Sequence, residues 1–138
     1  MELKIYTDGG ARGNPGPAGA GIVFCDDKKQ IKHKISRYLG EMTNNQAEYR
    51  AVIIALDHLL ENYKDCEVEF YLDSQLIVEQ LNQRYKIKNQ GLKPLFWEIR
   101  EKILKLGGKI NFEFVPREEN READKLVNKA IENLNQEK

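Results

Sequence analysis

The pattern of hydrophobic and polar positions along the chain predicts alternating strands and helices. Short runs rich in β-branched and aromatic residues indicate strands, and apolar positions that recur every three or four residues indicate helices. The expected strands cover residues 2–8, 21–24, 31–39, 67–72 and 110–115. The expected helices run over 47–63, from a Ser74 cap to Leu81, from Pro94 to the stop at Gly107-Gly108, and onward from a cap at Asn120.

The connections between these elements indicate the class of fold. The first three strands are joined by short turns, which favours an antiparallel meander. The helix over 47–63 then links the third strand to the fourth by a crossover, and such a crossover places the fourth strand parallel to its neighbour. The pattern therefore predicts an α/β fold with a mixed sheet.

Composition narrows the class of protein further. The 138 residues are enough for one domain with a sizeable core, and 41% hydrophobic and 32% charged residues are typical of a globular protein in solution. No apolar run reaches membrane-spanning length, and no signal peptide precedes the first strand, so we expect a cytoplasmic protein. The two cysteines, Cys25 and Cys66, form no metal-binding motif.

The balance of charge does not by itself indicate a partner, because the formal net charge is zero. Any affinity for nucleic acid must come from local clusters of basic residues. One cluster lies in a stretch without acids and contains Arg84, Lys86, Lys88 and Lys93. An earlier cluster contains Lys28, Lys29, Lys32 and Lys34. Taken alone, both clusters are more simply explained as solvated surface.

Four acidic residues carry the most information about chemistry. Asp8 and Asp73 end two strand-like runs, and Glu48 and Asp124 lie on the apolar stripes of two expected helices. If the first and fourth strands are parallel neighbours, the two aspartates meet where the strands end, and ligands favour that edge of an open sheet. Four inward carboxylates repel one another unless cations hold them. A pair of divalent ions does this best, which predicts metal-assisted phosphoryl chemistry.

Each acid also has a simpler explanation when it is considered alone. Asp8 before two glycines fits a turn, Asp73 fits the start of a helix, and Asp124 in a first helical turn complements the helix dipole. Glu48 is harder to explain in this way, because a buried glutamate without a partner is costly. The coincidence of all four favours a metal site.

Four motifs in order along the chain now permit a comparison with a known family. They are YTDGGARGNPG over 6–16, TNNQAE over 43–48, DSQ over 73–75 and NREAD over 120–124. With these motifs the sequence resembles ribonuclease H of type 1 over nearly its whole length, as a single domain covering residues 1–138. The resemblance implies a ribonuclease H-like mixed five-stranded sheet with helices on both faces. It also implies cleavage of the RNA strand of RNA/DNA hybrids, dependent on Mg²⁺ or Mn²⁺.

The resemblance also assigns roles to individual residues. It implies that the four acids bind two metal ions and are the catalytic residues: Asp8, Glu48, Asp73 and Asp124. Four side-chain amides match positions that contact the hybrid in its minor groove: Asn14, Asn44, Asn45 and Gln75. Amides both donate and accept hydrogen bonds, so they can read the 2′-hydroxyl that distinguishes RNA from DNA. Thr43 matches part of a pocket for a DNA-strand phosphate, although Thr43 or Asn44 is equally expected to cap a helix and Asn14-Pro15 to form a turn.

Three departures from the family pattern affect what we expect of the substrate. Arg117 occupies the place of a loop histidine that members often carry, and we expect His33 and His58 to be structural or surface residues. The chain lacks the inserted basic helix of some members, which makes Lys86 and Lys88 candidates for phosphate contacts. Glu41 stands where an arginine often supports the phosphate pocket, so cleavage of double-stranded RNA is left open.

Two alternatives belong to other classes of function. One is a non-catalytic hybrid-binding module of the same fold, and the other is a nuclease of this fold that acts on duplex DNA. All four acids argue against a pure binding module, because repelling carboxylates are of no use to it. The set of amides favours a reader of ribose over a reader of DNA. We expect a monomer, because no long apolar segment requires a partner.

Overall fold

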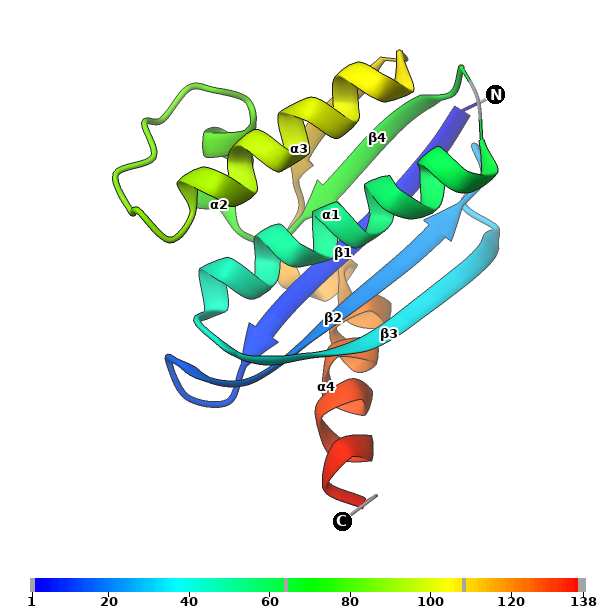
Figure 1. Cartoon of the computed structure of the whole chain (residues 1–138). Coiled ribbons are helices and arrows are strands. Elements are labelled where there is room, and N and C mark those ends of the chain that lie inside the picture. The colour runs from blue at the N-terminus through cyan, green and yellow to red at the C-terminus, as the bar shows by residue number, and fades with distance from the viewer. Residues whose placement is uncertain (1, 64, 108, 137–138) are drawn as a thin grey trace.

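The computed structural model describes residues 2–63, 65–107 and 109–136, with side chains as far as residue 133. Five strands form one sheet in the order β3-β2-β1-β4-β5 (Figure 1). The strands are β1 (Glu2–Ala11), β2 (Gly16–Cys25), β3 (Ile31–Met42), β4 (Glu67–Leu72) and β5 (Ile110–Phe114). β2 is antiparallel to both β1 and β3, and β4 is parallel to both β1 and β5. The mixed five-stranded sheet is as predicted.

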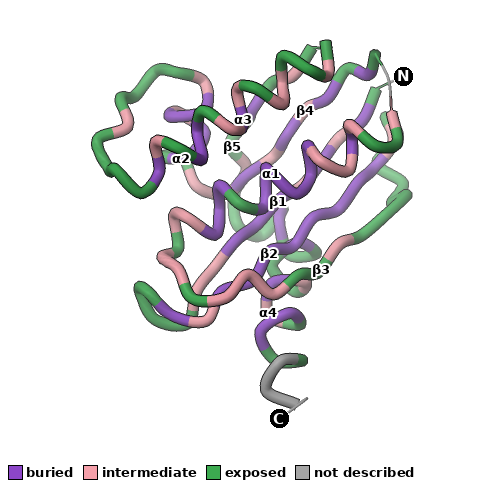
Figure 2. The backbone as a smooth tube through the Cα atoms, in the orientation of Figure 1, coloured by how far each residue is buried: buried purple, intermediate pink, exposed green. Residues whose placement is uncertain are grey.

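Helices cover both faces of this sheet (Figure 1). They are α1 (Asn44–Asn62), α2 (Gln75–Leu81), α3 (Lys93–Leu106) and α4 (Arg121–Gln136), with a short 3₁₀ helix at Arg117–Glu119. Side chains of β1 alternate between the two faces. Leu3 and Ile5 pack into the large core under α1, whereas Tyr6 packs with Ala123 of α4 on the opposite face. Figure 2 shows that the buried positions follow the central strands and α1. In the described part of the chain, no helix is long and apolar enough to cross a membrane.

The register of β1 against β4 determines where the strand-end aspartates lie. The parallel ladder pairs Lys4 with Glu69 and Tyr6 with Tyr71. Asp8 lies two residues after Tyr6, and Asp73 lies two residues after Tyr71. They therefore meet at the same edge of the sheet, as the sequence predicts.

Local capping fixes the ends of the helices next to this edge. Thr43 accepts a hydrogen bond from the Gln46 backbone N–H at 3.2 Å, and the Gln46 side chain accepts one from the Thr43 N–H at 3.0 Å, which forms a capping box. Ser74 caps α2 by accepting from Ile77 N–H at 3.4 Å. At the opposite end of the sheet, Gly107 ends α3 with φ of 66°. Gly108, the second residue of the expected stop, lies outside the described residues.

The first three strands are longer than predicted. β1 continues to Ala11, β2 already begins at Gly16, and β3 continues to Met42. Residues 18–20, which belong to the glycine-rich segment between the first two predicted strands, pair with residues 9–11 in the β1–β2 ladder. One reason for glycine there is the close approach of α4, because a Cβ at Gly21 would lie 2.1 Å from the carbonyl oxygen of Ala123.

The two histidines lie together, far along the sheet from the acids. Their rings stack with centroids 4.5 Å apart, and Phe24 packs against both. His33 comes from β3 and His58 from α1, so the stack joins the edge strand to the helix above it. This packing agrees with the structural role expected for them.

Candidate active site

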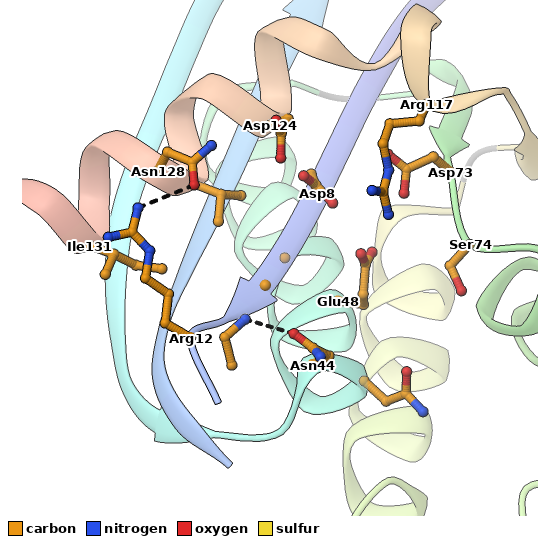
Figure 3. A pocket seen from close by; sticks show the side chains of 15 residues that line it. Asp8, Arg12, Asn44, Glu48, Asp73, Ser74, Arg117, Asp124, Asn128 and Ile131 are labelled. Carbon is orange, nitrogen blue, oxygen red and sulfur yellow. Dashed lines mark hydrogen bonds between the residues drawn. The ribbon is translucent and has the colours of Figure 1, made fainter. Parts of the chain in front are cut away.

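A cavity of about 420 Å³ opens where β1 and β4 end (Figure 3). Its wall combines the end of β1, the first turn of α1, the start of α2, the 3₁₀ helix and one side of α4. All four predicted acids line it: Asp8, Glu48, Asp73 and Asp124. Residues that are separated by more than a hundred positions in the sequence thus face one space.

Three of these carboxylates form a tight cluster. One oxygen each of Asp8, Glu48 and Asp73 lie within 4.8 Å of one another. Asp8 and Glu48 are each only 7% exposed, and Asp73 is half-buried. The Oε2 atom of Glu48 is buried and has no hydrogen-bond partner among the described residues. Such a set of hard oxygen donors fits a divalent cation.

The electrostatics of the cluster reflect its crowding. Burial raises the pKa of Asp8 to about 7, and the negative charges of Asp73 and Asp124 add to this effect. Burial also raises the pKa of Glu48 well above its usual range, with the charge of Asp8 as the next cause. The cluster therefore resists full ionisation until a positive charge compensates it.

The close contact of β1 with α1 brings Glu48 to the strand end. A Cβ at Gly9 would lie 2.2 Å from the carbonyl carbon of Ala47, so only glycine allows this approach. The Gly9 backbone N–H donates to the Glu48 carboxylate and counteracts part of the rise in its pKa. The expected inward direction of Glu48 is thus confirmed.

The expectation that Asp124 also points into the interior is wrong, because this residue is exposed. The buried residue at the start of α4 is its neighbour Ala123, which packs against the sheet. Asp124 lies about 100° further around the helix. It lines the cavity rim and faces Asp8 across it (Figure 3).

Two of the predicted amides tie the β1–β2 turn to the start of α1. The Asn44 side-chain oxygen accepts from the Ala11 N–H at 2.8 Å, and the Asn14 side-chain oxygen accepts from the Asn44 N–H at 3.0 Å. Asn44 and Asn45 line the cavity with the acids, whereas Thr43 caps α1. Gln75 is exposed in the first turn of α2, next to the cavity residue Ser74.

The predicted basic residues lie in two different places. Arg117, on the 3₁₀ helix, lines the cavity and extends toward Asp73 (Figure 3). Lys86 and Lys88 are exposed in the loop between α2 and α3. Lys86 lines a separate hollow with Tyr85 and Trp97, so the structure does not bring this loop to the acids.

Sequence reasoning missed two residues at the site. Arg12 lines the cavity and reaches α4, where it donates to Asn128 Oδ1 at 3.4 Å and forms an ion pair with Glu132 at 3.2 Å. Asn120 is buried beside Asp73, although we expected it only to cap a helix. Its place in a motif with Asp124 was the one available signal.

Comparisons with known proteins identify relatives of the chain. The family model described as Reverse transcriptase-like matches residues 6–130. A ribonuclease H of Trichodesmium erythraeum is 33% identical, over 96% of this chain and 90% of that protein. The solved structure of LC11-RNase H1, isolated from compost by a metagenomic approach, has a TM-score of 0.92 and 47% identity, over 96% of this chain and 97% of that one.

Other curated relatives are much longer than this chain. A bifunctional protein of Mycobacterium tuberculosis is 38% identical over 133 residues, which cover 96% of this chain but 36% of that protein. The chain thus spans about a third of the length of the first curated relatives that it matches.

Proposed function

The chain belongs to the ribonuclease H type 1 family, and from this membership we propose that it is an endoribonuclease that hydrolyses the RNA strand of RNA/DNA hybrids. The observation that carries the proposal is the convergence of Asp8, Glu48 and Asp73 within 4.8 Å at the end of β1. LC11-RNase H1, at 47% identity, has also been solved in complex with an RNA/DNA hybrid. The proposal includes a single ribonuclease H domain over residues 1–138 and, as expected from the sequence, a cytoplasmic monomer.

The donor set of the cavity fits Mg²⁺ or Mn²⁺. Both are hard ions that prefer oxygen ligands, and the buried Oε2 of Glu48 lacks any other partner among the described residues. We assign the binding of two ions to Asp8, Glu48, Asp73 and Asp124. Bound ions of this kind activate a water molecule and stabilise the leaving oxygen of a phosphodiester.

Individual residues of the site have different proposed roles in binding the metal ions and the hybrid. Asp8 lies centrally, because its carboxylate interacts with those of Glu48, Asp73 and Asp124. We propose that four side-chain amides contact the minor groove of the hybrid, because an amide can both donate a hydrogen bond to a 2′-hydroxyl and accept one from it. These are the side chains of Asn14, Asn44, Asn45 and Gln75. Asn44 and Asn45 support this assignment best, since they share the cavity with the acids. Thr43 is proposed to contact a phosphate of the DNA strand.

The test is cleavage of four end-labelled substrates of one sequence: an RNA/DNA hybrid, double-stranded RNA, single-stranded RNA and double-stranded DNA. Each is incubated with Mg²⁺ and then with Mn²⁺. We expect internal cuts in the RNA strand of the hybrid. Cuts in double-stranded RNA as well would place it among the substrates. A hybrid that is bound but never cut would support the non-catalytic binding module instead.

Arg117→Ala is expected to lower the turnover number roughly tenfold, which corresponds to about 1.4 kcal/mol of transition-state stabilisation. Arg117 is the arginine beside Asp73, but it is exposed and therefore contributes through a solvent-screened charge. Steady-state kinetics on the hybrid measures the change. The matched control is Arg121→Ala, since Arg121 is exposed nearby but does not line the cavity. A loss as large as that of Asp73→Asn would instead show that Arg117 takes part in the chemistry.

Reversing the charges of Lys86 and Lys88 to glutamate is expected to raise the Michaelis constant for the hybrid and to reduce its dependence on salt. Each lost phosphate contact lowers the slope of log affinity against log salt by about 0.9. The control reverses Lys28 and Lys29, which are exposed in the β2–β3 turn at the far end of the sheet. An unchanged salt slope in the Lys86 and Lys88 variant would show that these lysines contact no phosphate and are ordinary solvated surface residues.

A further inference from the structure

Asn120 is a deeply buried polar residue next to the carboxylate cluster, with 1% of its surface exposed. Its side-chain Nδ2 donates to the backbone oxygen of Thr7 at 2.9 Å and to Asp73 Oδ2 at 3.2 Å. One amide group thus links the end of β1 to the carboxylate that follows β4.

The chemistry of the two partners fixes the orientation of this amide. A backbone carbonyl and a carboxylate can only accept hydrogen bonds, so the –NH₂ end must face them. The reverse orientation would place Oδ1 against two acceptors. Asn120 therefore presents a donor to Asp73, whereas Asp8 and Glu48, which also lie close to Asp73, are acids.

The backbone of Asn120 reaches two further parts of the site. Its N–H donates to the Arg117 carbonyl at 2.9 Å, and its carbonyl accepts from the Asp124 N–H at 3.1 Å. The residue thus connects the 3₁₀ helix that carries Arg117 to the first turn of α4 that carries Asp124. The residue that donates a hydrogen bond to Asp73 is therefore also bonded, through its backbone, to Arg117 and Asp124.

We propose that Asn120 is a positioning residue, which holds the Asp73 carboxylate against β1 in the geometry that binds the metal ions. Asp73 lies in a bend after β4 and is half-buried, so the sheet ladder does not itself fix its side chain. Without the donor, repulsion from Asp8 and Glu48 moves the Asp73 carboxylate away from the cluster. This inference rests on the proposed function, because it assigns a role within that site.

The experiment compares Asn120→Ala with Asn82→Ala. Asn82 is a matched control because its Nδ2 also donates to a strand carbonyl, that of Phe112 at 2.9 Å, but touches no carboxylate of the site. Hybrid cleavage is measured against Mg²⁺ and Mn²⁺ concentration, well below the unfolding temperature of each variant. Metal-induced rise in unfolding temperature is measured in the absence of any nucleic acid. Asn120→Ser, which leaves a smaller void, replaces Asn120→Ala if the latter does not fold.

For the Asn120 variant we expect the half-maximal metal concentration to rise roughly 10- to 100-fold, as is usual when the partner of a metal ligand is removed. The metal-induced thermal shift should weaken in parallel, and the Michaelis constant for the hybrid at saturating metal should change little. Asn82→Ala should lose thermal stability but keep the metal dependence of the wild type. Wild-type metal dependence in the Asn120 variant, or an equal change in Asn82→Ala, would overturn the proposal.

The two readouts separate this proposal from the proposed function. If the wild-type chain cleaves no substrate but its metal-induced thermal shift depends on Asn120, the positioning role of Asn120 is supported and the proposed nuclease function is rejected. If the wild type cleaves the hybrid and the Asn120 variant binds metal normally, the nuclease stands and the positioning role fails.

Discussion

Asp73→Asn is expected to lower cleavage of the hybrid by at least about 1,000-fold, which corresponds to roughly 4 kcal/mol of transition-state stabilisation. Asparagine has nearly the same size and leaves the bend after β4 undisturbed. It removes one of the three carboxyl groups whose oxygens lie within 4.8 Å of one another, and a neutral amide oxygen is a weaker ligand for a divalent cation than a carboxylate. Single-turnover cleavage of an end-labelled hybrid measures the loss.

Hybrid binding and a surface control make this result interpretable. Fluorescence anisotropy should show that Asp73→Asn still binds the hybrid, because the amides around Asn44 are unchanged. Asp27→Asn, which removes an exposed carboxylate from the β2–β3 turn, should cleave like the wild type. Retention of more than about a tenth of the activity in Asp73→Asn would contradict the assignment of Asp73 as a metal ligand.

Asp8→Asn is expected to stabilise the metal-free protein at alkaline pH. The folded state raises the pKa of Asp8 to about 7 from 3.8, so the group favours folding fully at low pH and loses this contribution as the pH rises from about 4 to about 7. Above pH 7 the ionised, buried Asp8 costs on the order of a few kcal/mol. Asparagine removes the charge and with it the cost.

Thermal unfolding in the presence of a chelator measures this effect. The unfolding temperature of Asp8→Asn should exceed that of the wild type by several degrees at pH 8, and the two should converge near pH 4. Saturating Mg²⁺ should reverse the order, because only the wild type gains the full stabilisation from binding. Wild-type unfolding that is independent of pH between 4 and 8, or an Asp8→Asn variant that is less stable at pH 8, would contradict a crowded, uncompensated cluster.

Much of the site follows from periodicity, because regular elements dictate the direction of their side chains. Strand alternation and a parallel β1–β4 pair suffice to bring Asp8 and Asp73 to one edge. The helical period that buries Val52 and Leu56 also directs Glu48 inward. The same reasoning failed for Asp124. An apolar stripe shows which side of a helix faces the sheet, but it does not show where the sheet ends and the side chains on that stripe become exposed.

Other features depend on contacts that no local pattern encodes. The burial of Asn120 requires the end of β1, the bend at Asp73 and α4 to meet, and these are far apart in the sequence. The segment from Gly16 to Gly21 is rich in turn-forming residues, yet it is a strand that pairs with β1 and β3, and α4 packs closely on Gly19 and Gly21. The burial of Asn120 and the early start of β2 thus depend on tertiary packing, which the sequence pattern does not show.

The order in which the acids occur along the chain has a consequence for protein synthesis. β1, α1 and the bend after β4 supply the first three carboxylates, whereas the fourth comes from α4, after every strand of the sheet. A ribosome adding roughly 5–20 residues per second needs several seconds to pass from Asp73 to Asp124. During that interval the nascent polypeptide lacks Asp124, so the four carboxylates can come together only after α4 has left the exit tunnel and packed on the sheet.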